Sequence, residues 1–368
     1  MASEAHSNMM LIDRYIARSI AWSSVFVTLI LLTLFIFIDF IGELGDVGKS
    51  DYGVVQALVY VVLTLPELLY QLFPVLALLG TLVGLALLAN HGELIAIRAA
   101  GVSLWRILGS VSMIGFVFVV LSFVVGEWLA PQSGVLAEQY KSRLQSGDAA
   151  FKKTSKGYWL RDKSHFIYVA GLGSQGKLGS VRIWTVNDET LELTQSLRAE
   201  TAIVTDQKGR QGWQLNNVDV VTLSMSGVGE QHARTMLWHD LPDKSLLAAA
   251  STKPEELSTF ELLRYVNYLQ DNGIEAPSYE QTLYSKIVAP LTVAVMVLLA
   301  FPFVFGSLRS AGIGHYVFIG ACIGIGFHLL NELLRYSGLV YGLPPLFSAV
   351  APTILFFIIA VLSLRRIF

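Results

Sequence analysis

Long apolar runs dominate both ends of the chain. A helix needs about 20 consecutive apolar residues to cross the hydrocarbon core of a bilayer. The second run is too long for one upright crossing, and Pro66 and Pro74 interrupt it, which predicts a kinked or tilted helix. The pattern predicts an α-helical membrane protein with six transmembrane helices. The six runs are Ile20–Ile41, Val54–Ala89, Leu104–Gly126, Leu283–Phe305, Gly314–Leu334 and Leu346–Leu364.

Between the third and fourth runs lies a polar stretch with a different pattern. Short runs rich in β-branched and aromatic residues, such as "GSVRIWTV" and "GWQLNNVDVVTLSM", alternate with Gly, Asn and Asp. This spacing is typical of a β sandwich, a jelly roll or an open barrel. The segment "KPEELSTFELLRYVNYLQDNG" then predicts a helix that begins near Glu255 and Glu256 and ends at Asn272 and Gly273. We expect a membrane half at 1–130, a β domain with this helix at 131–281, and a second membrane half at 282–368.

Basic residues near the ends of the runs predict which side each loop faces, because arginine and lysine accumulate on the cytoplasmic side. The loop after the first run, "GELGDVGKSD", holds one lysine against three acidic residues. Both termini and the segment 90–101 should therefore be cytoplasmic. The β domain should lie outside, in the periplasm of a double-membraned bacterium. The supporting arginines are Arg14, Arg18, Arg98, Arg106, Arg309, Arg365 and Arg366.

Composition narrows the chemistry. Hydrophobic residues make up 54% of the 368 residues and charged residues 15%, whereas a soluble domain carries about 25% charged residues. No Lys/Arg-rich run indicates a nucleic-acid surface, and the single cysteine, Cys322, excludes an intramolecular disulfide. The "GDVGKS" loop lacks the first glycine of a phosphate-binding loop, and no hydrolase or metal-site motif is present. We expect a protein that is not an enzyme and holds no cofactor or metal, so a partner would supply any energy.

The segment "NHGELIAIRAAGVSLWRI", residues 90–107, predicts a short amphipathic helix at about 91–100. Its apolar residues fall at helical spacing beside Glu93 and Arg98, and Gly101 ends the helix. One interpretation is a simple connector, since loops are polar by default. The other is a helix that fits a groove on a partner protein, with its charges fixing the register. A minimal connector needs no such helix, which favours the second interpretation.

Several short sequences, in order along nearly the whole chain, resemble the LptF/LptG family of lipopolysaccharide export permeases. They are "LIDRYI" near the start, "GELIAIRAAGVS" after the second run, "GEWLAP" closing the third, "SKIVAPL" and "FPFVFGSLRS" around the fourth, and "VYGLPP" before the sixth. Each is weak alone, but their order around an inserted β domain is specific. "DRYI" and "GEWLAPQ" are more similar to the LptG type than to LptF.

The resemblance implies a subunit of an ABC-type transporter in the bacterial inner membrane. It implies a heterodimer with an LptF-type permease, a dimer of the ATPase LptB that hydrolyses ATP, and the bridge protein LptC. The complex would extract lipopolysaccharide and pass it to periplasmic jelly-roll proteins, and the β domain would itself be a jelly roll. The coupling helix would contact LptB through Glu93, Leu94, Ile97 and Arg98. The alternative is a membrane-anchored periplasmic lipid-binding or scaffold protein, although one span would suffice for an anchor.

Substrate contacts are expected from aromatic side chains in the spans and basic side chains at the outer rim. Phosphates favour arginine and lysine, which form charge-assisted hydrogen bonds with them. The alternative for each aromatic residue is contact with lipid or a neighbouring helix. The candidates for the acyl chains are Phe26, Phe35, Phe37, Phe73 and Phe327, and those for the phosphates are Lys141, Arg143 and Arg335.

The outer end of the first span departs from the family pattern. Where family members carry lysines, this chain has Asp39, Glu43 and Asp46. The phosphate contacts would then come from Lys49, Lys141 or a partner chain, or from divalent cations that bridge carboxylate and phosphate.

The fifth span carries three ionisable residues, His328, Glu332 and Arg335, on one helical face. Glu332 and Arg335 could line a polar substrate rim. They could equally form an inert intrahelical pair, because residues three apart are neighbours on a helix.

Overall fold

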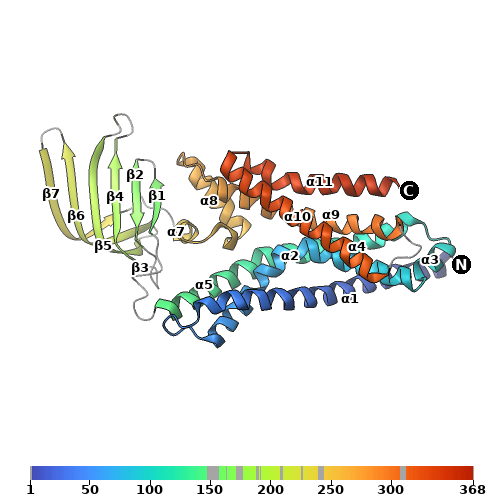
Figure 1. The fold of residues 1–368 in the computed structure, drawn as a ribbon. Helices are drawn as coiled ribbons and strands as arrows, with labels where there is room; N and C mark the ends of the chain where they lie inside the picture. Colours follow the sequence, from blue (N-terminus) through green and yellow to red (C-terminus); the bar gives the residue numbers. More distant parts are fainter. Residues whose placement is uncertain are drawn as a thin grey trace. The chain divides into compact units, whose positions relative to one another are not determined.

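The computed structural model describes residues 2–146, 157–162, 164–170, 177–187, 190, 192–207, 210–224, 227–238, 244–306 and 312–367. The chain divides into two compact units, whose elements Figure 1 shows. Arg309, one of the basic residues used above to predict sidedness, lies outside the described residues. The helical unit comprises Met1–Gly45, Ala57–Gly134 and Pro277–Phe368, and the β unit comprises Asp46–Gln56 and Val135–Ala276.

The apolar runs all form long helices. Six helices in the described ranges are long and apolar enough to cross a membrane, and a β sheet is inserted after the third, which confirms the predicted fold class. A short helix, α3 (Glu93–Ala99), lies between the second and third of them. The long helices are α1 (Ala2–Glu43), α2 (Val54–Asn90), α4 (Leu104–Val124), α9 (Pro277–Gly306), α10 (Ile313–Tyr341) and α11 (Pro345–Arg365).

The most enclosed of these helices is α2. Of its most apolar window, 72% is buried inside the chain, against none of the corresponding window in α1. Leu78, Leu82 and Leu85 are fully buried there, and the helix stays continuous through Pro66 and Pro74. The core of the helical unit is therefore arranged around α2.

Two glycines allow α1 to approach α2 closely. A Cβ atom on Gly80 would lie 2.0 Å from Ser24 Oγ, and one on Gly84 would lie 2.7 Å from Ile20 Cα. The Ser19 hydroxyl donates a hydrogen bond to the Gly84 carbonyl at 3.2 Å. Membrane helices often contact each other at small residues spaced four apart, because small residues let the two backbones approach closely. Dispersion contacts at this short range, and not the hydrophobic effect, hold helices together in lipid.

The third span continues further than its apolar run predicts. A π-helical turn, η2 (Val125–Leu129), follows α4, and α5 (Ala130–Ser146) extends the helix without a break. The boundary expected at residue 131 thus falls inside a continuous helix. Proline leaves the carbonyl four residues earlier without its helical donor. For Pro131 that carbonyl belongs to Glu127, within the π turn, so the irregular hydrogen bonding is concentrated in one place.

The β unit is built on one antiparallel sheet of the order β1-β2-β4-β5-β6-β7, with β3 beside β5. The rings of His165 in β2 and Trp238 in β7 lie 5.5 Å apart. Three strands separate β2 from β7 in the sheet order, and adjacent strands are about 4.8 Å apart, so the sheet curves around its core. The strands are β1 (Tyr158–Asp162), β2 (His165–Val169), β3 (Lys177–Leu178), β4 (Val181–Val186), β5 (Leu193–Gln207), β6 (Arg210–Ser224) and β7 (Gly227–Trp238).

Alternate side chains of the strands form the core of the β unit. Ile167, Ile183 and Leu197 are buried on the concave face, where Leu247 of α7 (Lys244–Ser251) joins them. The opposite, convex face carries the intervening side chains. This alternation is what a sheet with one buried face requires.

The helix predicted after the sheet is present as α8 (Thr259–Asp271). It begins later than expected, because Ser258 and Glu261 form a capping box, while Pro254–Glu256 forms a separate 3-10 turn, η5. Its end agrees with the prediction, since Gly273 has the left-handed φ of +66° that terminates helices.

The contact between α1 and α2 predicts the effect of one added methyl group. In Gly80→Ala the new Cβ would meet Ser24 Oγ at 2.0 Å and Ser24 Cα at 2.6 Å. Overpacking of this kind costs about 1–3 kcal/mol, so the melting temperature in detergent should fall.

Gly109→Ala in α4 is the matched control, because nothing lies within 4 Å of the added Cβ. Alanine is the better helix former by about 0.5–1 kcal/mol, so this variant should melt at the same temperature or higher. Equal destabilisation by the two changes would contradict the close packing of α1 on α2.

Candidate functional site

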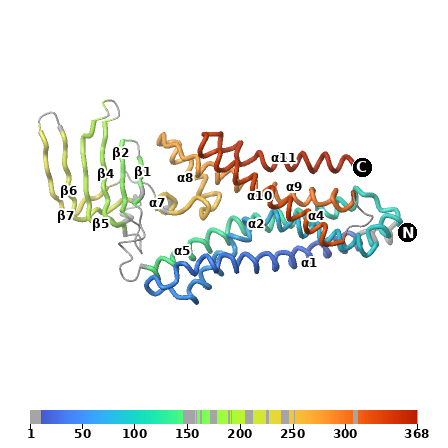
Figure 2. Tube along the Cα trace, in the orientation of Figure 1, coloured from blue at the N-terminus to red at the C-terminus, as the bar shows by residue number. Residues whose placement is uncertain are grey.

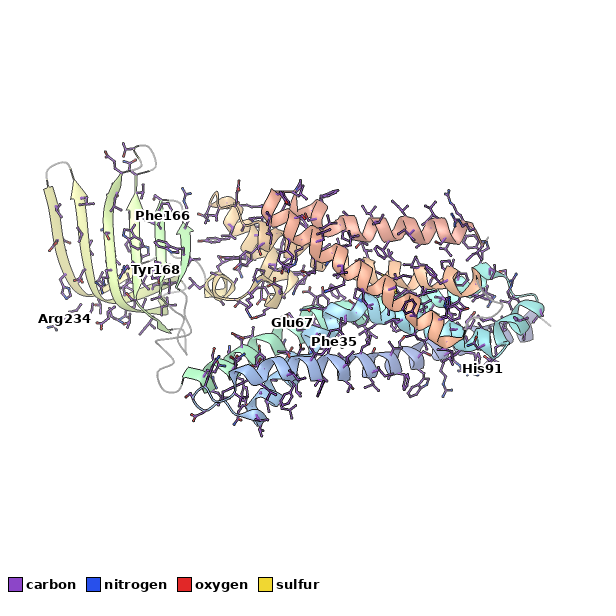
Figure 3. The ribbon with its side chains drawn as sticks, in the orientation of Figure 1. Phe35, Glu67, His91, Phe166, Tyr168 and Arg234 are labelled. Carbon is purple, nitrogen blue, oxygen red and sulfur yellow. The ribbon has the colours of Figure 1, made fainter. Side chains whose placement is uncertain are left out.

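The connection between α2 and α4 is a structured turn–helix–turn. Gly92, with φ of 74°, starts α3, and Gly101, with φ of 87°, follows it. Ser103 then caps α4, its hydroxyl accepting a hydrogen bond from the Arg106 amide at 3.4 Å. The helix predicted for about residues 91–100 is therefore present. Figure 2 shows it at the end of the helical unit where both termini lie, and Figure 3 labels His91 in the turn before it.

One face of α3 packs on the helical unit. Leu94 is fully buried in the same core as Ile16 and Ile107, and Ile97 packs against that core. Glu93 accepts a hydrogen bond from the Tyr15 hydroxyl of α1. The Oε2 atom of Glu93 is buried and finds no hydrogen-bond partner in the described ranges. Three of the four predicted coupling residues thus hold α3 to its own chain.

The opposite face of α3 is exposed and mixes apolar and basic groups. Ile95 is 56% exposed, Trp105 at the start of α4 is 66% exposed, and Arg98 and Ala99 are also exposed. We call Ile95, Arg98, Ala99 and Trp105 the α3 outer surface. Arg98 was selected from the sequence, whereas Ile95 and Trp105 were missed. The helical period supplies the signal, because a buried Leu94 turns Ile95 about 100° away from the core.

An acid on α1 ties this region to α4. Asp13 accepts a hydrogen bond from Arg106 Nη2 at 3.1 Å and one from the buried Ser110 hydroxyl at 2.6 Å. These partners lie more than 90 positions away along the chain. Sequence reasoning did not single out Asp13, although its place within "LIDRYI", just before the first apolar run, is a signal.

The five candidate phenylalanines fall into two environments. On α1, Phe26 and Phe37 are each 62% exposed, and Phe35, labelled in Figure 3, is half-buried. Phe73 packs against the core of the helical unit, and Phe327 is buried with its ring edge-on to Phe356 at 5.3 Å. Within the described part of the chain, no ring contact joins two of the five.

Glu332 and Arg335 on the polar face of α10 form the intrahelical ion pair that was one of the two alternatives predicted from the sequence. Arg335 donates to Glu332 Oε2 from Nη2 at 2.8 Å and from Nε at 3.1 Å, and its guanidinium lies 4.5 Å from the Tyr336 ring. Both charged side chains remain about one-third exposed, and His328 is exposed. The pair is formed, and its role toward substrate stays a prediction.

In the β unit, two lysines share one carboxylate. Asp46 Oδ2 pairs with Lys141 of α5 at 2.7 Å, and Oδ1 accepts from Lys49. The Lys141 ammonium also lies 5.9 Å from the centroid of the buried Tyr52 ring. The predicted rim residue Lys141 is thus held in place, and Arg143 is exposed. Asp46 is one of the three acids found where family members carry lysines. Its charge is neutralised by Lys49 and Lys141, the two lysines expected to make the phosphate contacts instead.

A buried cation lies in the helical unit where the sequence drew no attention. Lys286 of α9 is 8% exposed and lies 5.9 Å from the centroid of the Tyr70 ring of α2. The same ring packs over Gly126 in the π turn, where a Cβ would come within 2.3 Å. Ionisable groups inside spans are costly and often functional. The sequence signal for this buried lysine is that Lys286 is the single charge in "SKIVAPL" and lies three residues after the start of the fourth apolar run.

The described part of the chain holds no group of three His, Cys, Asp or Glu side chains that could bind a metal. Its spans, inserted sheet and structured α3 define a polytopic membrane protein with an extramembrane β domain. Residues 14–366 match the family model described as lipopolysaccharide export system permease LptF/LptG. The chain belongs to this family, as the sequence predicted.

Similar proteins carry the LptG name. The lipopolysaccharide export system permease protein LptG of Haemophilus influenzae is 33% identical over 350 residues, which is 94% of this chain and 96% of the relative. LptG of Escherichia coli K12 is 33% identical over 358 residues, covering 96% and 98% of the two chains. LptG of E. coli O6:H1 gives the same values. These similarities agree with the LptG type expected from "DRYI" and "GEWLAPQ".

The link from α1 to α4 predicts a measurable coupling between Asp13 and Ser110. A hydrogen bond to a charged acceptor contributes about 1.5–3 kcal/mol. In a double-mutant cycle of Asp13→Ala and Ser110→Ala, the unfolding free energies in detergent should therefore be non-additive by about 1 kcal/mol or more.

Ser122 supplies the control cycle, because it is buried in the same helix and its hydroxyl has no hydrogen-bond partner among the described residues. Asp13→Ala and Ser122→Ala should combine additively. Additive effects in both cycles would show that Asp13 does not tie α1 to α4.

Proposed function

We propose that this chain is the LptG-type permease subunit of a lipopolysaccharide exporter that is driven by ATP hydrolysed on a partner. The observation that carries the proposal is the α3 outer surface, an apolar and basic face on a helix that is fixed to the rest of the helical unit. The family match supports lipopolysaccharide as the substrate. A scaffold protein would have no need for such a helix or for six packed spans.

The proposed contact with the ATPase is made by the α3 outer surface. Arg98 and the exposed Ile95 and Trp105 would dock in a groove of the partner, as amphipathic helices do. Leu94, Ile97 and Glu93 serve a different purpose, because they anchor α3 to the helical unit. This division refines the predicted set, in which all of Glu93, Leu94, Ile97 and Arg98 touch LptB.

Motion of α3 would pass to three spans. It follows α2 after two residues, it is joined to α4 through the capped turn at Ser103, and Asp13 connects α4 to α1. A ligand shifts a conformational equilibrium only through interactions that differ between the two states. The ATP-driven closure of an LptB dimer would supply that difference at α3.

The proposed orientation places α3 and both termini in the cytoplasm and the β unit in the periplasm of a bacterium with two membranes. The basic residues Arg98, Arg106 and Arg365 support this, because they lie in or beside elements at the α3 end of the helical unit. The chain would then be a multi-pass protein of the inner membrane.

The partners proposed from the family are an LptF-type permease, an LptB dimer and the bridge protein LptC. The isolated chain leaves room for them, because none of the apolar window of α1 is buried within the chain. The exposed apolar surface of α1 would contact lipid, a partner helix or the acyl chains of the substrate. Phe26 and Phe35 lie on this helix, whereas Phe73 and Phe327 would contribute from the core.

Phosphate groups of the substrate are proposed to meet Lys141, Lys49 and Arg143 in the β unit and Arg335 in the helical unit. The shared Asp46 carboxylate keeps the two lysines ordered while no phosphate is present. A phosphate would form charge-assisted hydrogen bonds of the same kind. Glu332 would hold Arg335 in the same manner.

Reversing the charge of Arg98 tests the proposal. In the purified complex with its ATPase, Arg98→Glu should leave the chain folded and ATP hydrolysis measurable, because Arg98 is exposed. Release of lipopolysaccharide per ATP hydrolysed should fall about tenfold, since charges at an interface fix register.

Two variants serve as controls. Arg366→Glu, at an exposed arginine just after α11, should transport normally. Leu94→Ala should lower the unfolding free energy by about 2–5 kcal/mol, as other buried leucines do. Normal export by Arg98→Glu, with a normal ratio of ATP to substrate, would refute the coupling role of α3.

A further inference from the structure

The convex face of the sheet carries a row of two aromatic side chains, two arginines, one acid and one histidine on six adjacent strands. The strand register places residues directly opposite each other, with their side chains on the face that does not form the core. From β1 to β7 the row reads Trp159, Tyr168, Arg182, Arg198, Asp219 and His232.

At one end of the row, aromatic rings form a cluster. Trp159 stacks on Trp184 at a centroid distance of 5.2 Å and an interplanar angle of 21°, and it contacts Tyr168 at 5.2 Å. The guanidinium of Arg161 lies 5.1 Å from the Phe166 ring. Figure 3 labels Phe166 and Tyr168 on β2. Trp159 is nonetheless 60% exposed, and exposed apolar patches rimmed by polar groups mark binding surfaces.

Beside this cluster, two arginines face each other. Arg182 of β4 and Arg198 of β5 are direct cross-strand partners, and both are exposed. Neither forms an ion pair with a residue in the described ranges. The acid next in the row, Asp219, pairs instead with His232 at 2.7 Å.

Like charges directly opposite each other destabilise a sheet. Two adjacent guanidinium groups also create a local positive potential, because Asp219, the acid opposite Arg198, pairs with His232. Planar guanidinium groups bind phosphate and carboxylate through two parallel hydrogen bonds. The pair is therefore complementary to an anion that approaches the convex face.

We propose that the convex face of the β unit is a binding site for an anionic saccharide. A sugar ring would lie against the exposed face of Trp159, within the cluster of Tyr168 and Trp184. A phosphate on the same saccharide would be held by Arg182 and Arg198. The proposal rests on the proposed function, since the saccharide portion of a lipopolysaccharide is the ligand of this chemistry that an exporter of this family meets. It adds a contact separate from the acyl-chain and rim contacts.

The arrangement favours a saccharide over an acidic protein. The exposed aromatic rings beside the arginines present flat apolar faces that suit the C–H face of a sugar. An acidic protein would need only the positive charges of the arginines for binding. A strip of acidic peptide would bind the arginines and leave the stacked indoles without a role. The Trp159→Ala variant distinguishes the two ligands.

Calorimetric titration of the full chain in nanodiscs tests the proposal. The probe is the phosphorylated oligosaccharide that remains when lipopolysaccharide is completely deacylated, with an enzymatically dephosphorylated sample beside it. Replacing both arginines, Arg182→Gln with Arg198→Gln, should raise the dissociation constant about tenfold, since two charge-assisted contacts are lost. Trp159→Ala should weaken binding severalfold, and removal of the phosphates should weaken binding to the unaltered chain.

The matched control is Arg234→Gln on β7, labelled in Figure 3, an exposed arginine of the same sheet without an aromatic ring contact in the described part of the chain. It should bind the oligosaccharide as the unaltered chain does. Unchanged affinity in the double arginine variant would overturn the proposal, and so would equal affinity for the dephosphorylated oligosaccharide.

Two further outcomes are decisive. If Trp159→Ala binds the oligosaccharide as tightly as the unaltered chain, the rings have no role, the face recognises charge alone and the proposal fails. If intact lipopolysaccharide binds but the deacylated oligosaccharide does not, recognition lies in the acyl chains and the proposal fails. Neither result would disturb the proposed function, which depends on export coupled through Arg98 and fails separately.

Discussion

Close contact between α2 and its neighbours is the constraint on which the rest of the helical unit depends. Inside a membrane, apolar side chains are surrounded by lipid and not by water, so packing them between helices brings no hydrophobic gain. Helices therefore associate only where their surfaces fit at short range. Gly80 and Gly84 allow α1 to approach α2, and Gly320 and Gly324 do the same for α10, where added Cβ atoms would lie 2.6 Å from Leu79 and Val75. This packing makes α2 a rigid centre, and α3 begins two residues after it ends.

The rigid packing around α2 holds the short α3 helix in a fixed position. A helix of seven residues has little stability of its own, and α3 is ordered because Leu94 is buried in the core and glycines with positive φ bound the helix. Its outer surface is then presented in a fixed orientation. The same core contacts, together with Asp13, join it to α1, α2 and α4. A connection of this kind transmits displacement, whereas a flexible loop would absorb it.

Local patterns in the sequence account for much of this structure. Apolar runs of about 20 residues predict spans because only a helix satisfies its backbone in lipid, and all six runs form helices. The strands were predicted from alternation, but not their order, which depends on pairings between distant segments. The third span was predicted too short, because the polar residues after Gly126 and the proline at 131 indicate an end to the run, and the π turn accommodates both.

The candidate site was predictable in part. The presence and position of α3 followed from its periodicity. Arg98 is exposed on this helix, and its contact with a partner stays a prediction. Which apolar residues face inward was not predictable, because Leu94, Ile95 and Ile97 are chemically alike and only the packing of α1 and α4 distinguishes them. Asp13 was missed for a related reason, since Arg106 and Ser110 lie far away along the chain. Asp46, Lys49 and Lys141 were each named from the sequence, but the pairing of Asp46 with the distant Lys141 was not.

Photo-crosslinking from Ile95 tests the proposed contact between the α3 outer surface and the ATPase most directly. A photoreactive amino acid replaces Ile95, which is 56% exposed, and in a parallel sample it replaces Trp128 in η2, which is 59% exposed. Trp128 lies beyond the far end of α4, about 35 Å along the helix from α3. Contact through the α3 outer surface predicts an adduct with the ATPase from position 95 and none from position 128. No adduct from position 95 in an actively transporting complex would contradict it.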